Sequence, residues 1–318
     1  MSQTLIHIVT VLGVLLGLLG VSAGLIWVER RLLALWQERW GPNRVGPAGL
    51  LQPVADILKI LWKEDWVPPL ADRPVFVIAP ALVIVAAMMS FAVVPFAPGI
   101  EIADMNIGLL FFLAMSSLAV YSVALGGWSS NNKYALLGSM RAVGQMVSYE
   151  VFMGLALMGV VVQAGTFSLR EIVEAQGPLW FCVPQFVGFV VFLIAGLAET
   201  RRLPFDLPEA ENELVAGYHT EYSGMKFAMF FLGEYVGITL VSALIVTLFF
   251  GGWKGPLLPP LAWFLIKTSI FICLFILARA TFPRPRYDQL MAFGWKLMLP
   301  LALANLLATG AVVLARGP

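Results

Sequence analysis

The chain has 318 residues, of which 60% are hydrophobic and only 12% are charged, with 20 Lys and Arg against 19 Asp and Glu. Average soluble proteins are about 45–50% apolar and about 25% charged. This composition excludes an ordinary cytosolic enzyme, a disordered chain and a nucleic-acid binder of the basic-patch kind. We therefore predict an all-α, polytopic membrane protein, in which every charge inside the bilayer needs a physical reason.

Residues that hold metals and redox groups are scarce. The sequence contains two cysteines, Cys182 and Cys273, and two histidines, His7 and His219. It has no Cys-x-x-Cys pair, no P-loop and no strand-linked glycine motif for nucleotides. We therefore expect this chain to bind no metal, haem or iron–sulfur cluster by itself.

Eight apolar segments are long enough to cross a bilayer, which takes about 20 mostly apolar residues. They are Leu5–Val28, Val75–Phe96, Asp104–Gly126, Ala142–Ala164, Leu179–Ala198, Lys226–Phe250, Leu261–Phe282 and Met291–Leu314. The first is much longer than the core of a signal peptide, so we expect it to be an uncleaved span. Its GxxxG pairs, Gly13/Gly17 and Gly20/Gly24, predict close packing against another helix.

Positive charge is concentrated on one side of these spans. Sixteen of the 20 Lys and Arg lie in the loops 29–74, 127–141, 199–225 and 283–290 or in the adjoining helix ends, and three lie on the opposite side. The positive-inside rule then predicts that these loops are cytoplasmic and that both termini are periplasmic. We expect Lys267, inside the seventh span, to snorkel toward the outer face, and Arg279 to be a simple cytoplasmic anchor.

The first of these loops contains an amphipathic pattern. Apolar residues recur at helical spacing between Leu50 and Leu61, while Gln52, Asp56 and Lys59 occupy another face. This pattern predicts a helix of about four turns that lies at the membrane interface. A re-entrant packing helix without any chemistry remains an alternative.

Two carboxylates lie inside predicted spans. Glu150 and Glu234 each follow the cytoplasmic end of a span by eight residues, which is roughly 12 Å along a helix. Their matched depth favours a shared polar cavity or a proton relay, although a structural ion-pair network explains them equally well.

The loop between the fifth and sixth spans is acidic, with Glu199, Asp206, Glu209, Glu211, Glu213 and Glu221. Such a bundle could transport ions, bind an amphiphile or dock a soluble partner.

Several strings of the sequence resemble the family of NADH–quinone oxidoreductase (respiratory complex I) membrane subunits that includes the bacterial H subunit and its mitochondrial counterpart, subunit 1. They are Glu29-Arg30-Arg31, Gly41–Pro47, Lys63-Glu64-Asp65, Ser148-Tyr149-Glu150, Glu199-Thr200, Pro204–Glu211 and Glu221–Gly224. The resemblance covers essentially the whole chain. Arg201 stands where the family usually has asparagine, and we expect this loop difference to have little effect.

The resemblance implies a subunit that forms the quinone tunnel at the junction with the hydrophilic arm and couples quinone reduction to proton translocation. It implies a tunnel lined by Glu29, Arg30, Arg39, Asp56 and Lys59. It also implies a proton or charge relay through Glu150, Glu234, Glu199, Asp206, Glu209, Glu211, Glu213 and Glu221. The chain itself would bind no cofactor, since FMN and iron–sulfur clusters belong to partner subunits.

The same resemblance implies partners and a location. The partners would be hydrophilic quinone-site subunits, small and antiporter-like membrane subunits, quinone and lipid, without nucleic acid. The location would be the bacterial inner membrane. Three other functions stay open: a related membrane subunit of an energy-converting hydrogenase, a stand-alone ion or proton transporter, and a structural anchor.

Overall fold

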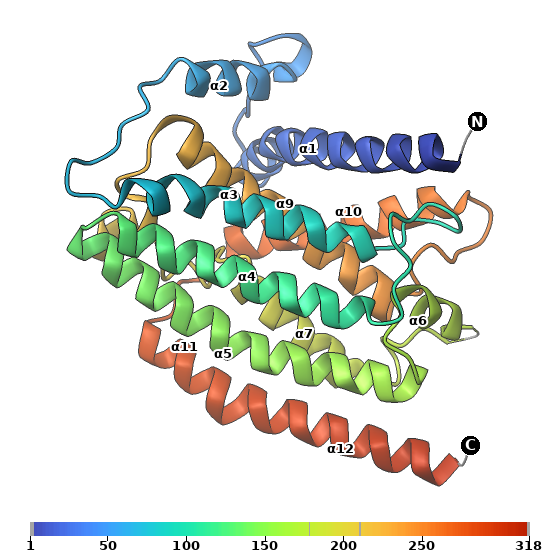
Figure 1. Cartoon of the computed structure of the whole chain (residues 1–318). Coiled ribbons are helices and arrows are strands. Elements are labelled where there is room, and N and C mark those ends of the chain that lie inside the picture. Colours follow the sequence, from blue (N-terminus) through green and yellow to red (C-terminus); the bar gives the residue numbers. More distant parts are fainter. Residues whose placement is uncertain (1–2, 178, 210, 317–318) are drawn as a thin grey trace.

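The computed structural model describes residues 3–177, 179–209 and 211–316, and every regular element among them is a helix (Figure 1). The long helices are α1 (Gln3–Trp36), α3 (Arg73–Ser90), α4 (Gly108–Ser129), α5 (Lys133–Ala164), α9 (Gly224–Phe249), α10 (Pro260–Thr281) and α12 (Leu299–Arg316). The shorter helices are α2 (Gln52–Leu61), α6 (Leu169–Ala175), α7 (Phe186–Glu199), α8 (Glu211–Leu214) and α11 (Tyr287–Phe293). One π-helical turn, Gly294–Met298, joins α11 to α12, and short 3₁₀ turns occupy Pro47–Gly49, Phe91–Val93 and Gly217–His219. The predicted all-helical membrane fold is confirmed.

Seven helical segments of the described residues are long and apolar enough to cross a membrane. The eighth expected span, Leu179–Ala198, corresponds to α7, which has only 14 residues. The helix is short because the chain from 179 to 185 forms turns before α7 begins. A helix of 14 residues rises about 21 Å. This short helix packs against α5, α9 and α12.

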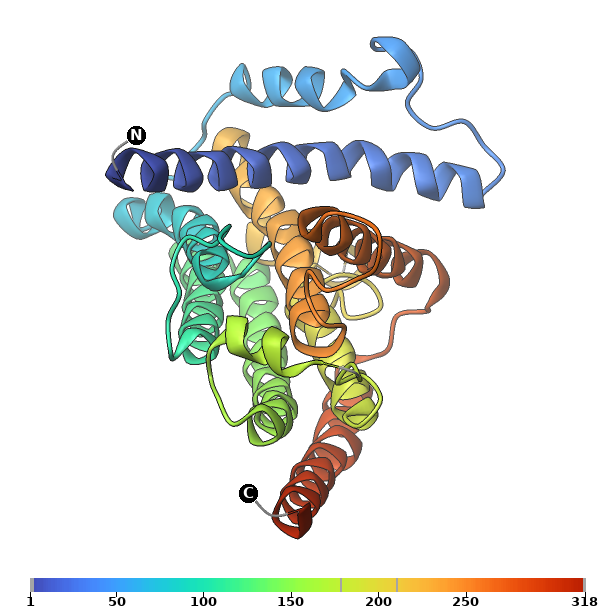
Figure 2. The same ribbon diagram turned by 90° about the vertical axis from the view of Figure 1, so that its right-hand side faces the viewer.

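The bundle has α9 near its centre, in contact with α1, α3, α7 and α10. Helices α1 and α2 lie on one side of it and α12 lies on the opposite side (Figures 1 and 2). Both termini are at the same end of the bundle, and the loop that contains α2 turns back at the other end. The placement of both termini at one end and of this loop at the other agrees with the expected topology. The orientation in a membrane stays a prediction.

Several helices continue beyond the spans that hydropathy predicted. Helix α1 extends to Trp36, so that Glu29 and Arg30 lie on its last turns and not in a loop. Helix α5 begins at Lys133, where the side chain of Asn132 accepts a hydrogen bond from the Tyr134 N–H at 2.8 Å. This side-chain cap satisfies one of the free backbone N–H groups at the start of α5.

The amphipathic helix α2 is shorter than the four turns expected. It has ten residues, and the turn Pro47–Gly49 precedes it. Gly49 has a φ of +75°, and a Cβ atom there would lie 2.3 Å from the carbonyl oxygen of Pro42. The backbone therefore requires glycine at this turn, which separates α2 from the preceding Gly-Pro segment.

The expectation that Lys267 snorkels to the outer face is wrong. Its side chain is 6% exposed, and its ammonium group donates to the backbone carbonyls of Phe250, Gly252 and Lys254 at 2.7, 3.1 and 2.7 Å. The indole ring of Trp180 lies 4.5 Å from the charge. Lys267 therefore fastens the turn that follows α9, where carbonyl groups at a helix end lack intrahelical partners.

The GxxxG pairs of α1 do not mediate close packing within the described chain. A Cβ atom at Gly13, Gly17, Gly20 or Gly24 would meet nothing within 4 Å. Close packing occurs instead between α4 and α5, where a Cβ atom on Gly127 would lie 2.3 Å from Ser139. Small residues thus allow two helices to approach closely in this fold, but the helices are α4 and α5 and not the predicted α1.

Candidate functional site

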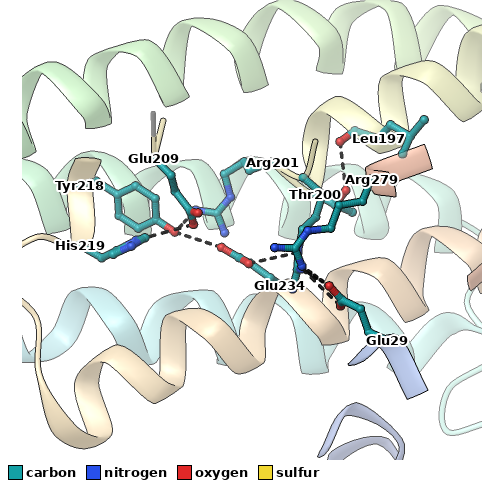
Figure 3. Close-up of polar contacts among 10 residues, drawn as sticks. Glu29, Leu197, Thr200, Arg201, Glu209, Tyr218, His219, Glu234 and Arg279 are labelled. Carbon is teal, nitrogen blue, oxygen red and sulfur yellow. Dashed lines mark hydrogen bonds and ion pairs between the residues drawn. The ribbon is translucent and has the colours of Figure 1, made fainter. Parts of the chain in front are cut away.

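A cavity of about 180 Å³, here called the charged cavity, lies between the loop 200–219 and the helices α9 and α10. Its lining combines arginines, acids and aromatic rings: Arg201, Arg202, Leu203, Asp206, Glu209, His219, Phe227, Phe230, Phe231, Glu234 and Arg279. The loop contributes most of the polar groups, and α9 contributes the phenylalanines together with Glu234. Several of these residues are drawn in Figure 3.

The centre of the polar contacts is an alternating set of arginines and glutamates. The Arg202 guanidinium lies 3.2 Å from Glu29 on α1 and 3.4 Å from Glu234 on α9. Glu29 also accepts a hydrogen bond from Arg279 at the end of α10. Glu29 and Glu234 are 3% and 6% exposed, so each buried carboxylate has the counter-charge that its burial requires. Arg279 is therefore not a simple anchor.

A second branch runs from Glu234 to Arg201. The Tyr218 hydroxyl donates to Glu234 at 3.5 Å and accepts from Arg201 at 2.9 Å. Arg201 is 5% exposed and has a φ of 54°, a left-handed conformation that asparagine adopts more readily than arginine. The residue expected to be a minor loop difference thus lies at the centre of the site (Figure 3).

Burial sets the protonation of the loop groups. Burial raises the pKa of Asp206 to about 6, although Arg284 and Arg279 oppose the shift. Burial, with Glu234 and Asp206 nearby, raises the pKa of Glu209, whereas burial lowers the pKa of His219. The 3.8 Å approach of His219 to Glu209 is therefore a contact of two neutral groups near neutral pH and not an ion pair.

A second pair of acids lies between α4, α5 and α7. Adjacent serines of α4 hold them: Ser117 donates to Glu150 at 2.5 Å and Ser116 donates to Glu199 at 3.1 Å. A cavity of about 60 Å³, here called the inner cavity, is lined by Ser116, Glu199, Arg201 and Glu234 together with apolar side chains. Glu234 thus shares a cavity with Glu199, and the serine pair places Glu150 beside Glu199.

Some buried polar atoms around these two cavities have no protein partner among the described residues. They are Glu199 Oε2, Arg201 Nε, Arg202 Nη2 and Asp206 Oδ1. Buried polar groups in proteins are nearly always hydrogen-bonded, to protein or to ordered water. The cavities are large enough for water, so we expect solvent or a polar ligand to complete these contacts.

An apolar cavity of about 220 Å³ lies between α1, α2 and α9. Its lining is Leu19, Ala23, Ile26, Ile57, Ile60, Met225, Ala228, Met229, Phe231 and Leu232. Phe231 also lines the charged cavity. One aromatic ring therefore separates an apolar space, bounded by the amphipathic helix, from the buried charges.

The predicted tunnel residues fall into three places. Glu29 belongs to the central ion network, whereas Arg30 pairs with Asp56 at 2.8 Å and Lys59 lies 3.6 Å from the same carboxylate. The pKa of Asp56 is lowered, because hydrogen bonds and charges from its neighbours outweigh the opposing effect of burial. Arg39 is exposed and donates to Gln37 at 2.8 Å.

The remaining predicted relay acids lie apart from the cavity linings. Glu213 pairs with Arg141 at 2.5 Å, and Glu221 accepts a hydrogen bond from Asn132 at 2.6 Å. Asn132 is the N-cap of α5, and Arg141 lies on the third turn of that helix. The side chain of Glu211 lies outside the described residues.

Sequence reasoning did not assign Arg202, Arg279 or Tyr218 to the site. The signal that could have found them is the number of buried acids, since each needs a cation or a donor from another helix. Within the described ranges, no group of three or more His, Cys, Asp or Glu side chains could hold a metal ion.

Comparison with known proteins identifies the family of the chain. Residues 9–310 match the family model described as NADH dehydrogenase. The chain is 66% identical over 306 residues to the H subunit of the NADH-quinone oxidoreductase of Methylococcus capsulatus (strain Bath), and the match covers 96% of this chain and 97% of that protein. The chain therefore belongs to the NADH dehydrogenase family.

Proposed function

We propose that the chain is the membrane subunit of a proton-pumping NADH–quinone oxidoreductase, that it guides quinone to its reduction site, and that it couples reduction to proton movement. The observation that carries this proposal is the apolar cavity that meets the charged cavity at Phe231. A quinone has an apolar tail and a polar headgroup, and this pair of cavities matches both ends. Membership of the family and the name of the 66% identical relative support the same function.

The apolar cavity suits a ligand that arrives from lipid. Helix α2 contributes Ile57 and Ile60, while α1 and α9 contribute the other walls. An isoprenoid tail is stabilised there by burial of its surface at about 25 cal/mol per Å². The headgroup then lies toward Phe231 and the arginines of the charged cavity.

Reduction of a quinone by two electrons consumes two protons. In the proposed mechanism the electrons come from an iron–sulfur cluster of a partner subunit, and this chain supplies charge and protons. Asp206 and Glu209 have raised pKa values, so each can hold and release a proton near neutral pH. Arg202 stays charged, because Glu234 and Glu29 raise its pKa against the opposing effect of burial.

Proton movement would continue from this loop into the bundle. The steps are Glu234, the inner cavity, Glu199 and then Glu150 across the serine pair of α4. Water in the inner cavity would bridge Glu234 to Glu199. Redox-linked charge in the charged cavity would act on Glu234 through Arg202 and Tyr218.

The proposal includes partners and a location. The partners are the FMN- and iron–sulfur-carrying subunits, the quinone-site subunits and the small and antiporter-like membrane subunits. We also propose a bacterial inner membrane location with periplasmic termini, which the concentration of positive charge in the loops 29–74, 127–141, 199–225 and 283–290 supports.

Photolabelling tests the quinone path. A quinone whose tail carries a photoreactive group should label α1, α2 and α9 at the apolar cavity in the assembled complex, and excess unlabelled quinone should prevent it. Methionines Met225 and Met229 are convenient markers for the peptide analysis. Labelling confined to the opposite end of the bundle would contradict the proposal.

Substitution tests the coupling path. Glu234→Gln and Glu150→Gln should each lower quinone reduction and proton pumping in an assembled complex, because each removes a proton-binding group. Glu213→Gln is the matched control, since Glu213 makes its ion pair at the surface. Coupled turnover at the normal rate in both relay variants would refute the relay.

A further inference from the structure

Helix α2 is held at its first end by α1. The indole N–H of Trp27 donates to the carbonyl of Ala48 at 3.1 Å, and Arg30 pairs with Asp56 at 2.8 Å. Trp27 and Arg30 lie on consecutive turns of α1. Trp27 contacts the turn before α2, and Arg30 contacts the second turn of α2. They hold one side of the apolar cavity.

The second end of this segment is held by α9. The Lys226 ammonium lies 2.6 Å from both carboxylate oxygens of Asp65. Beside it, the Ser223 hydroxyl donates to the carbonyl of Glu64 at 3.2 Å. We call the Asp65–Lys226 pair the α2–α9 clamp, because it joins the chain just after α2 to the start of α9.

The clamp differs from an ordinary surface ion pair on its lysine side, since Lys226 is buried while the Asp65 side chain is 56% exposed. Lys226 is 6% exposed, and its charge lies 5.7 Å from the centre of the Phe76 ring. Exposed ion pairs contribute little, whereas removal of one partner from a buried charge leaves that charge uncompensated. Asp65 is thus the carboxylate on which the buried Lys226 ammonium depends.

The position of the clamp connects two walls of one cavity. Met225, Ala228 and Met229 lie beside Lys226 on α9 and line the apolar cavity, whose opposite wall is Ile57 and Ile60 of α2. Helix α2 lies outside α1 and is joined to α3 by an extended segment without helix (Figures 1 and 2). Without the clamp, the polar contacts that still hold this wall among the described residues are those with α1 at the start of α2 and the hydrogen bond from Ser223 to the Glu64 carbonyl.

We propose that Asp65 and Lys226 are positioning residues that hold α2 over the apolar cavity and so fix the width of the entrance for an amphiphile. This inference rests on the proposed function for the identity of the amphiphile, a long-tailed quinone. The clamp itself touches neither the headgroup region nor the charged cavity. Its effect is therefore expected on entry of the tail and not on the chemistry at the headgroup.

A distance measurement tests the geometric part. The full chain in lipid nanodiscs, with Cys182 and Cys273 replaced by alanine, receives spin labels at Trp62→Cys after α2 and Leu137→Cys on α5; both native side chains are exposed. Asp65→Asn and Lys226→Met should broaden the distance distribution. Asp65→Glu, which keeps the charge, should restore the narrow distribution. The control Glu64→Gln changes the neighbouring charge and should leave it unchanged.

Kinetics of the assembled complex test the functional part. Asp65→Asn should raise the KM for a long-tailed quinone by at least about threefold, with kcat changed less than about twofold, because binding of the tail weakens while the reacting end is unaffected. The KM for a short-tailed quinone should not change. Asp65→Glu should recover the long-tail KM, a result that a general loss of stability does not produce.

The outcomes separate the clamp from the function on which it rests. An unchanged distance distribution in Asp65→Asn and Lys226→Met overturns the clamp, whatever the kinetics. A broadened distribution with equal KM changes for both quinones overturns its role at the entrance. Photolabelling away from the apolar cavity, with the distribution still broadened, refutes the proposed quinone path and leaves the clamp as a purely structural tie.

Discussion

Replacement of Arg202 by methionine is the sharpest test of the buried charge network. Arg202 lies 3.2 Å from Glu29 and 3.4 Å from Glu234, and its guanidinium carbon is 4.5 Å from the centre of the Tyr235 ring. Methionine keeps an unbranched side chain but removes the charge. Among the described residues, Glu29 retains Arg279, whereas Glu234 retains the 3.5 Å hydrogen bond from Tyr218 and the more distant charge of Arg201 beyond it.

The expected cost follows from the carboxylate left behind. Removal of one partner from a buried ion pair costs about 3–5 kcal/mol, because the remaining charge is uncompensated. The second substitution Glu234→Gln removes that charge, so the double variant should be more stable than the sum of the two single losses by about 1–3 kcal/mol. Glu29 should contribute little to this coupling, since Arg279 still neutralises it.

The assay is unfolding of the purified chain by titration with SDS in mixed micelles, read by circular dichroism. Arg141→Met is the matched control, because its pair with Glu213 is exposed and is expected to contribute less than about 1 kcal/mol. The reasoning is refuted if Arg202→Met destabilises no more than Arg141→Met. Strict additivity of Arg202→Met and Glu234→Gln would also refute it.

Three further predictions use the same assay. Lys267→Met should destabilise the chain by about 2–4 kcal/mol because three backbone carbonyls lose their donor. Lys254→Met, at a half-exposed site with two such bonds, should cost less, about 1 kcal/mol. Because the pKa of Asp206 is raised to about 6, the folded chain binds more protons than the unfolded chain between about pH 4 and 6, so stability falls with rising pH there, and Asp206→Asn should remove this fall. Arg201→Asn should recover about 1 kcal/mol of backbone strain at φ 54°, and it should lose part of that gain because Tyr218 loses its donor. A flat pH profile in the parent chain, or a loss above about 2 kcal/mol in Arg201→Asn, would contradict the last two.

Sequence alone predicted the helical class and most long helices, because apolar runs of about 20 residues have few other solutions. It misjudged α7, since hydropathy does not register that Pro184 and the turns before it delay the helix to Phe186. It also divided α1 at Glu29, because a charge reads as the end of a span. In the structure that charge stays on the helix, since Arg202 and Arg279 neutralise it.

The sequence indicated several of the acidic residues of the candidate site, but it did not indicate the arginines that pair with them. Glu150 and Glu234 were recognised because a carboxylate in an apolar run is conspicuous, whereas Glu199 was counted with the acidic loop. Arg279 and Arg202 were counted as loop charges, since a positive residue after a span has an ordinary explanation. Which charge faces which depends on contacts between helices distant in sequence, and one-dimensional patterns do not specify them.

The charged groups of the site are nearly balanced, as they are in the whole chain, which has 20 Lys and Arg against 19 Asp and Glu. Arg201, Arg202 and Arg279 face two glutamates, Glu29 and Glu234, in direct contacts or through Tyr218. These contacts leave one excess positive charge near the charged cavity, where Asp206 and Glu209 are the remaining acids of its lining. Burial is the main reason that the pKa values of Asp206 and Glu209 are raised, and the neighbouring arginines, with Arg284 among those that act on Asp206, oppose the shift. The cations therefore offset only part of the cost of ionising these two acids, and under the proposed function a proton held there is one that a reduced quinone can take.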